Sequence, residues 1–128
     1  TSVTLILSAM VTTQTPATEK YPMSIKALKA YARLDFEGTG ANRKQWLCLN
    51  KVWQQESHWN YHAVGDKTSE GRAYGIAQAL PANKMNDIKK DWHTNPYTQI
   101  QWGVKYIRLH WHNNACAAWK NELRKGWY

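Results

Sequence analysis

Apolar residues recur at helical spacing along much of the chain, beginning near residue 23. Ser24 is of a type that commonly caps the N-terminus of a helix. The apolar positions after it recur in steps of one, three and three, at Ala27, Leu28, Tyr31 and Leu34. Gly38 and Gly40 then interrupt the pattern. The segment between Ser24 and Gly38 is therefore predicted to form an amphipathic helix.

A second helix is predicted to begin after Asn42, another common capping residue. One face of this helix is marked by residues in steps of three, four and three, at Trp46, Leu49, Trp53 and Glu56. Glu56 therefore occupies a position that faces the core. Because the helix is predicted to end near Ser57, Glu56 also stands at its C-terminal end.

The helical period is lost between residues 60 and 78. Gly65, Gly71 and Gly75 stand among polar residues in this segment, which predicts a loop or a short, twisted hairpin. Pro81 begins a further short helical or turn segment that reaches Trp92.

Two more helices are predicted toward the C-terminus. Asn95 and Pro96 are typical of an N-cap and a first helical position, and the apolar stripe behind them is Ile100, Val104, Ile107 and Trp111. A last helix, ending at Gly126, is predicted to hold the apolar positions Ala115, Cys116, Trp119 and Leu123. The predicted fold class is mainly α (α+β), with one small β or loop insert.

The length of 128 residues allows one domain with its own core. We expect an N-terminal tail over residues 1–22 and a domain over residues 23–128. The run from Val3 to Val11 is far shorter than the roughly 20 residues of a spanning helix, so stable membrane insertion is not expected. Together with Thr12–Thr18 it fits a signal-peptide or linker remnant, and equally an ordinary strand or helix.

The net charge of +8 predicts a surface that attracts a polyanion, such as nucleic acid, an anionic membrane or an anionic cell-wall polymer. The chain also has eight Trp and seven Tyr against one Phe. Trp and Tyr combine an apolar ring with a polar atom, which suits flat amphipathic ligands such as sugar rings or bases.

Neither the cysteines nor the histidines predict a metal site. Cys48 and Cys116 form no Cys-x-x-Cys pair, and their number fits either one disulfide in an exported chain or two free buried thiols. His58 and His62 are four positions apart, but no glutamate follows His58 as it does in zinc proteases.

Glu56 is the residue most suited to catalysis. At its predicted position it is partly desolvated, lies near the negative end of the helix dipole, and is flanked by Trp53 and Trp59. All three effects raise the pKa of a carboxyl group. A carboxylic acid that is still protonated near neutral pH can protonate a glycosidic oxygen. The alternative is a surface glutamate on a helix that ends one turn earlier.

Two motifs resemble those of the lysozyme-like lytic transglycosylases of the soluble class. Glu56-Ser57-His58-Trp59-Asn60 is similar to their Glu-Ser signature, and Ala73-Tyr74-Gly75-Ile76-Ala77-Gln78 is similar to their Gly-Leu-Met-Gln signature. The resemblance is to the branch of small transglycosylase-like domains in actinobacterial secreted proteins and phages, and it covers about residues 42–128. Further segments match that branch in order, among them Trp46-Leu47-Cys48-Leu49, Asp91-Trp92, Thr94-Asn95-Pro96, Trp102-Gly103, Ala118-Trp119 and Gly126-Trp127-Tyr128.

The resemblance implies a lysozyme-like fold that cleaves peptidoglycan between N-acetylmuramic acid and N-acetylglucosamine without a cofactor. Glu56 would protonate the leaving oxygen and then deprotonate the muramoyl 6-hydroxyl, closing a 1,6-anhydro ring. Gln78 and the backbone around Gly75 and Ile76 would line the muramoyl subsite. Ser57 would orient the end of the glutamate helix or touch the substrate.

The chain departs from the family at a third signature, Ala-Tyr-Asn, whose tyrosine hydroxyl contacts the catalytic glutamate. The corresponding stretch here is Ala118-Trp119-Lys120. Because Trp119 offers an indole N–H and no hydroxyl, Tyr106 or Tyr74 is expected to supply the hydroxyl instead.

Asp66 leaves a second reaction open. It lies ten positions after Glu56 in a Gly-containing loop and is followed by Thr68, an order similar to that of phage-type lysozymes. A muramidase would use Asp66 to assist a water molecule, whereas a solvated loop aspartate would take no part.

Two functions without catalysis are alternatives. The retained Glu56 disfavours a cell-wall or virion binding module. Nucleic-acid binding is not expected, because the basic residues are scattered and no recognised motif is present.

The resemblance further implies a disulfide between Cys48 and Cys116, because cysteines recur at both places in this branch. The expected partners are peptidoglycan glycan strands and the anionic polymers that accompany them. Basic side chains that could hold those polymers are Lys89, Lys90, Lys120, Arg124 and Lys125. We expect the protein to be secreted, in the cell wall or on a phage tail, and to be a monomer outside a virion.

Overall fold

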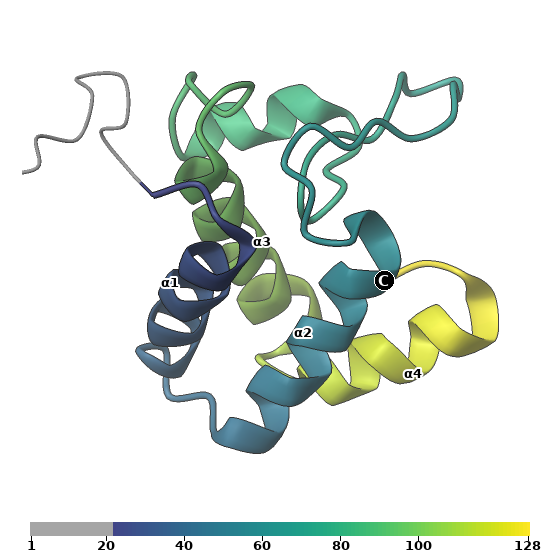
Figure 1. The fold of residues 1–128 in the computed structure, drawn as a ribbon. Coiled ribbons are helices and arrows are strands. Elements are labelled where there is room, and N and C mark those ends of the chain that lie inside the picture. The colour runs from purple at the N-terminus through teal and green to yellow at the C-terminus, as the bar shows by residue number, and fades with distance from the viewer. Residues whose placement is uncertain (1–21) are drawn as a thin grey trace, which may run out of the picture.

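The computed structural model describes residues 22–128. Its helices are α1 (Ile25–Glu37), α2 (Arg43–Ser57), the 3-10 helix η2 (Ala82–Asp87), α3 (Pro96–Trp111) and α4 (Ala115–Lys125). Figure 1 shows α1 packed beside α3, with α2 and α4 forming a second pair. The mainly helical class predicted from the sequence is confirmed. No helix of this part of the chain is long and apolar enough to cross a membrane.

The N-terminal segments that the sequence singles out, Val3–Val11 and Thr12–Thr18, lie outside the described residues. The interpretation of residues 1–22 as a tail therefore stays a prediction.

Each α-helix begins at a polar side chain that satisfies a free backbone amide of the first turn. The predicted caps are confirmed, because Ser24, Asn42 and Asn95 each accept a hydrogen bond from an amide two or three residues later. Asn114 caps α4 in the same way, accepting a 2.9 Å hydrogen bond from the amide of Ala117.

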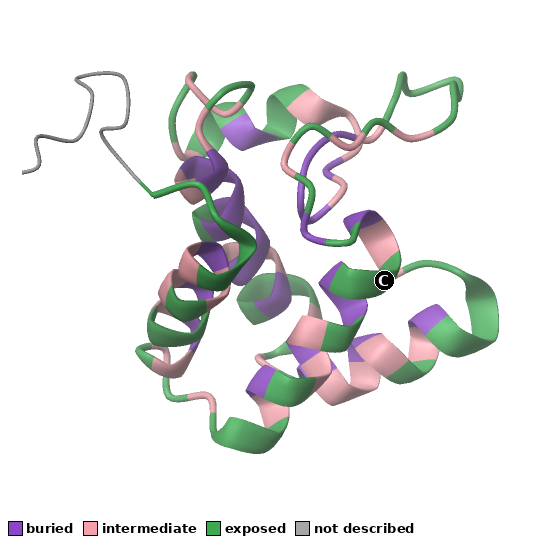
Figure 2. Ribbon diagram, viewed as in Figure 1, coloured by how far each residue is buried: buried purple, intermediate pink, exposed green. Residues whose placement is uncertain are grey.

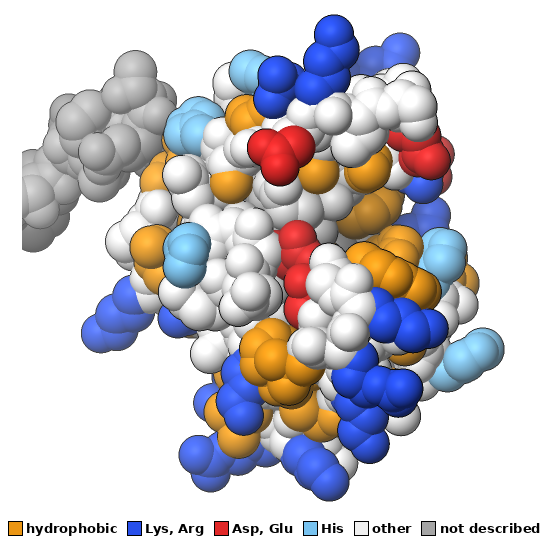
Figure 3. All heavy atoms as spheres, turned by 90° about the vertical axis from the view of Figure 1, so that its right-hand side faces the viewer, with side chains coloured by type: hydrophobic (Ala, Val, Ile, Leu, Met, Phe, Trp, Pro, Cys, Tyr) orange, Lys and Arg blue, Asp and Glu red, His pale blue; other side chains and the backbone are white. Residues whose placement is uncertain are grey.

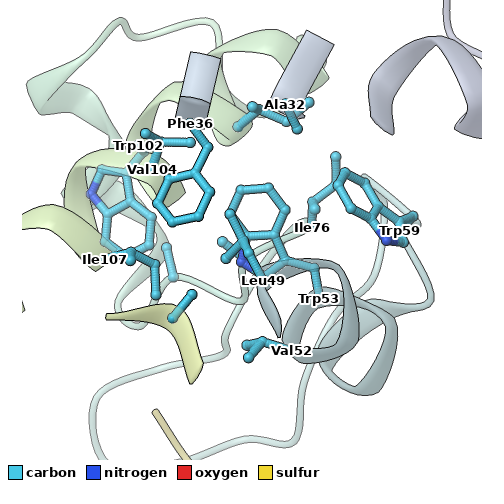
Figure 4. Packing of buried hydrophobic residues seen from close by; sticks show 14 of the residues in the cluster. Ala32, Phe36, Leu49, Val52, Trp53, Trp59, Ile76, Trp102, Val104 and Ile107 are labelled. Atoms are coloured by element: carbon cyan, nitrogen blue, oxygen red, sulfur yellow. The ribbon is translucent and has the colours of Figure 1, made fainter. Parts of the chain in front are cut away.

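The core lies between the inward faces of the helices, as Figure 2 shows. The stripe predicted for α2 is confirmed, since its three apolar members are buried and Glu56 is half-buried. Trp53 is fully buried in the middle of the cluster shown in Figure 4. Gly103 of α3 faces the Trp53 ring, and a side chain at residue 103 would collide with it. The close approach of α3 to α2 therefore depends on this glycine.

Two predicted stripes are partly wrong. Leu34 and Leu123 are 74% and 66% exposed, although their spacing predicts that both face the core. Leu28 and Ala115 are buried as their stripes indicate. The other buried positions are Ala32 and Phe36 in α1, and Ala118 and Glu122 in α4. Small residues occur on several sides of these two helices. The apolar pattern therefore does not determine which face of each helix turns toward the core.

The segment between α2 and η2 is the insert predicted from the sequence. It holds isolated antiparallel bridges, at Val64–Tyr74, Thr68–Gly71 and Tyr74–Ala79, and no regular sheet among the described residues. Thr68 and Gly71 exchange backbone hydrogen bonds of 2.8 and 3.1 Å. The hairpin therefore closes tightly at its tip, and the returning chain passes the end of α2.

A disulfide joins α2 to α4 in the N-terminal halves of both helices. Cys48 and Cys116 form it with a Cα–Cα distance of 4.9 Å, as the family resemblance implied. The C-terminal ends of α2 and α4 lie farther along the same pair, on the side shown at the right of Figure 1.

Candidate active site

Glu56 lies in the last turn of α2 and faces a cavity of about 280 Å³. The cavity walls come from α2, the insert, η2, α3 and the C-terminal segment. Its lining residues are Glu56, Ala73, Ala77, Gln78, Leu80, Lys84, Trp102, Tyr106, Gly126, Trp127 and Tyr128. Figure 3 views this side of the molecule and shows acidic side-chain atoms in its middle, with hydrophobic and basic side chains beside them. Among the lining residues, Glu56 alone carries a side-chain carboxyl group.

The environment of Glu56 favours its protonated form. Burial, a hydrogen bond with Glu122 and the negative charge of Glu122 together raise the pKa of Glu56 from 4.5 to about 8, with burial the largest cause. A carboxyl group with such a pKa is mostly protonated at neutral pH. Glu56 is therefore able to donate a proton to a bound molecule.

The end of α2 is tied to the insert by a buried serine. Ser57 Oγ donates a 2.7 Å hydrogen bond to the carbonyl oxygen of Ile76. The amide of Ile76 in turn donates to Gln99 Oε1 of α3 at 2.9 Å, and Gln99 Nε2 donates to two loop carbonyls at 2.9 Å each. This network fixes the segment around Ile76 between α2 and α3.

Gly75 is required by this same network. Its φ of 85° lies in the left-handed region, which glycine adopts without steric cost. A Cβ atom at residue 75 would also overlap the side-chain amide of Gln99. Gly75 therefore allows the turn to lie directly on Gln99.

Gln78 lines the cavity and is held from two sides. Its Nε2 donates hydrogen bonds to the carbonyl oxygens of Ala63, at 3.1 Å, and Gly75, at 2.9 Å. Both donor hydrogens of the amide are thereby used, so the side chain has a fixed orientation at the cavity wall.

Tyr128 closes the cavity from the C-terminal segment. Its hydroxyl accepts a hydrogen bond from Trp53 Nε1 at 3.1 Å and donates one to the carbonyl oxygen of Ala77 at 2.6 Å. Burial raises the pKa of Tyr128 well above its usual value, and the charge of Glu56 adds to this effect. Tyr106 of α3 donates a 2.6 Å hydrogen bond to the backbone carbonyl of Tyr128, so the two tyrosines form one wall.

A family model described as the transglycosylase SLT domain matches residues 34–121. The chain belongs to this family. Neither a curated protein nor a solved structure matched the chain in the corresponding searches. The resemblance recognised in the sequence is thus confirmed at the level of the family, and the lysozyme-like helical fold agrees with it.

The structure brings together three of the residues that the sequence assigned to a transglycosylase site. Glu56, Gln78 and Tyr106 line one cavity. Ser57 is buried behind the cavity, where it joins the helix end to Ile76. Gly75 and Ile76 stand in the same turn and support the wall from behind.

The remaining candidates, including Asp66 of the alternative muramidase reaction, are not among the residues that line the cavity. Tyr74 is buried among aromatic rings and donates a 2.9 Å hydrogen bond to the carbonyl oxygen of His93. Trp119 is half-buried on α4 against the core. Asp66 is exposed in the hairpin. Of the two tyrosines proposed from the sequence to replace the third signature, the structure places Tyr106 near Glu56.

Sequence reasoning missed Glu122 and Tyr128. Glu122 follows Ala115 and Ala118 in steps of three and four, the same spacing that drew attention to Glu56, but the predicted stripe runs one position away. Tyr128 lies after the last helix, where no periodic pattern predicts its contact with Trp53. Sequence reasoning also missed Gln99. Its hydrogen-bond partners are far away in the sequence, so no local pattern indicates them.

The described residues hold no group of three or more His, Cys, Asp or Glu side chains that would suit a metal ion.

Proposed function

We propose that this member of the transglycosylase family is a peptidoglycan lytic transglycosylase that cleaves the β-1,4 bond between N-acetylmuramic acid and N-acetylglucosamine. Glu56 is its catalytic acid and base. The observation that supports this most is the position of Glu56, a half-buried carboxyl group with a pKa of about 8 on a cavity of about 280 Å³.

In the first step, the protonated Glu56 donates its proton to the glycosidic oxygen as the bond to the muramoyl C1 breaks. The resulting carboxylate then accepts the proton of the muramoyl 6-hydroxyl, whose oxygen attacks C1 and closes a 1,6-anhydro ring. Glu56 ends the reaction protonated, as it began. One carboxyl group is sufficient, because the substrate supplies the nucleophile and no water molecule has to be activated.

The other cavity residues suit a sugar chain. Trp102 and Trp127 present aromatic rings and Gln78 presents a fixed amide, which together resemble the mixed apolar and polar surface that a pyranose ring needs. A second cavity of about 280 Å³ shares Lys84, Trp102 and Tyr106 with the first. The two cavities therefore adjoin at these three residues.

Hydrolysis is the alternative outcome of the same site. A muramidase would need Asp66 or another group to assist water, and Asp66 is exposed and is not among the residues that line the Glu56 cavity. This position supports the transglycosylase reaction over hydrolysis.

Mass spectrometry of peptidoglycan digested by the purified protein tests the proposal. A 1,6-anhydro end is expected, whereas hydrolysis adds one water and leaves a reducing end. The Asp66→Asn variant is tested in parallel and is expected to give the same products at a similar rate. Reducing ends, together with a loss in Asp66→Asn as large as that in Glu56→Gln, would assign the chain to the muramidases.

We also propose that the enzyme is secreted or carried on a virion and that it binds the anionic polymers of a cell wall. A net charge of +8 suits the anionic polymers of a cell wall, and the disulfide suits a secreted or virion-borne protein. Binding of the intact protein to purified cell walls, before and after removal of the anionic polymers, measures how much these polymers contribute to binding. Equal binding to both preparations would contradict it.

A further inference from the structure

Glu122 is a carboxyl group buried inside the protein without a cationic partner. It lies on α4 and is only 8% exposed. Its Oε2 atom is buried and has no hydrogen-bond partner. The ion pairs of the described region, Arg33–Glu37 and Lys89–Asp91, do not involve it. A buried carboxylate in such surroundings carries a large desolvation cost.

The side chain of Glu122 contacts that of Glu56. The two side chains share a hydrogen bond, and each lies near the C-terminal end of its helix. A hydrogen bond between two carboxyl groups requires a proton on one of them, because two carboxylates offer only acceptors. The disulfide between α2 and α4 holds the two helices together, so this approach is built into the fold.

We propose that Glu122 is a positioning residue that shares one proton with Glu56, and thereby keeps the Glu56 carboxyl protonated and oriented toward the cavity. Glu122 is absent from the cavity lining, so it acts on the substrate only through Glu56. This inference rests on the function proposed above for Glu56.

Other titratable groups surround the pair of carboxyl groups. Tyr106 faces it from α3 and Tyr128 from the C-terminal segment, and burial raises the pKa of both hydroxyls, which keeps them neutral. Lys84 of η2 lines the same cavity and is exposed. The charged neighbours on the two helices themselves are also exposed: Lys51, His58, Lys120, Arg124 and Lys125. The buried carboxyl groups beside the cavity are therefore those of Glu56 and Glu122, and the neighbouring cations point into solvent.

The Glu122→Gln variant tests the proposal, because it keeps the shape of the side chain but removes its charge. The side-chain amide introduced by this substitution would also donate a hydrogen bond to the ionised form of Glu56. We expect the pH at which Glu56 titrates to fall by about one unit or more. The readouts are the carboxyl ¹³C signal of Glu56 in the free protein and the alkaline limb of kcat/KM on peptidoglycan, which should move together.

Glu70→Gln is the matched control, because Glu70 is exposed at the hairpin tip and its substitution removes the same charge. It is expected to leave both readouts unchanged. Titration of Glu56 at the wild-type pH in Glu122→Gln, with only a lower melting temperature, would show that Glu122 is merely structural and would overturn the proposal.

The wild-type protein provides a test that does not depend on a stable variant. An experimental structure of the wild type should place a carboxyl oxygen of Glu122 within hydrogen-bond distance of a carboxyl oxygen of Glu56. A larger separation would refute the pairing. Because this distance is measured without substrate, a failure of the proposed function is seen separately, as undiminished cell-wall cleavage by Glu56→Gln.

Discussion

The hydroxyl of Ser57 donates a 2.7 Å hydrogen bond to the carbonyl oxygen of Ile76. This bond joins the residue after Glu56 to the turn that carries Gln78. The two segments that resembled family signatures in the sequence are therefore linked directly in space. The position of Glu56 relative to Gln78 is consequently set by buried hydrogen bonds rather than by exposed side chains.

Glu56→Gln is expected to lower the rate of cell-wall cleavage at least about a hundredfold, because the amide cannot donate the proton that general acid catalysis requires. The rate is measured as the clearing of a cell-wall suspension, and circular dichroism checks that the variant is folded. Glu37→Gln, in the exposed ion pair with Arg33, is the control and should clear walls at the wild-type rate. Near wild-type clearing by Glu56→Gln would show that Glu56 is not the catalytic acid.

Stability should depend on pH through Glu56. Its pKa is about 8 in the folded protein and 4.5 in its ordinary state, so the folded protein binds more protons than the unfolded chain between these values. The free energy of unfolding contributed by Glu56 is therefore fully present below about pH 4.5 and is lost as the pH rises through about 8. Glu56→Gln removes this dependence.

Thermal unfolding measured between about pH 5 and pH 8 checks this linkage. The melting temperature of Glu56→Gln should rise relative to that of the wild type as the pH increases. Two parallel curves would mean that the folded state does not hold the Glu56 proton.

Tyr128→Phe is expected to lower the free energy of unfolding by about 1–3 kcal/mol, because Trp53 Nε1 and the carbonyl oxygen of Ala77 both lose their partner. Tyr31→Phe is the matched control, since the Tyr31 hydroxyl accepts a more exposed hydrogen bond from Gln101. Urea unfolding of both variants gives the comparison. An unchanged free energy of unfolding in Tyr128→Phe would show that the Tyr128 hydroxyl does not stabilise the cavity wall.

Gly75→Ala and Gly71→Ala form a second matched pair. Both glycines have a positive φ, but a Cβ would meet Gln99 at residue 75 and open space at residue 71. Each variant is expected to lose about 1–2 kcal/mol of stability from the backbone conformation, and Gly75→Ala about 1–3 kcal/mol more from overpacking. Chemical unfolding measures the difference, and an equal effect at both sites would contradict the packing of the turn on Gln99.

Removing the disulfide should destabilise the protein without changing its fold. Replacing Cys48 and Cys116 by alanine is expected to lower the free energy of unfolding by about 4 kcal/mol, the chain-entropy value for a loop of this length. Urea unfolding measures the loss. Thiol titration of the unreduced, denatured wild type is the check, and two reactive thiols there would show that the bond is absent.

The comparison of α2 with α4 shows what the sequence could and could not predict. In α2, three large apolar side chains recur on one side, so the direction of Glu56 followed from spacing. In α4 the buried positions before Glu122 are alanines, which resemble other small residues around the helix. The rotation of α4 depends on packing against α2, and a pattern within one helix contains no information on that contact.

The part of the cavity wall that the C-terminal segment contributes could not be predicted from a local sequence pattern either. Tyr128 contacts Trp53 across 75 positions, and such a pairing depends on the whole fold. The family resemblance supplied the motifs of the site, whereas the side chains around Glu56 required the structure.

The disulfide also closes a covalent ring that contains the exposed hairpin tip at residues 66–71. Exposed tips are where proteases cut folded chains most readily. A single cut there would place Glu56 and Gln78 on different peptides, one holding Cys48 and the other Cys116. The two peptides would stay one molecule until a reductant cleaved the disulfide, so a nicked chain would retain both sides of its cavity.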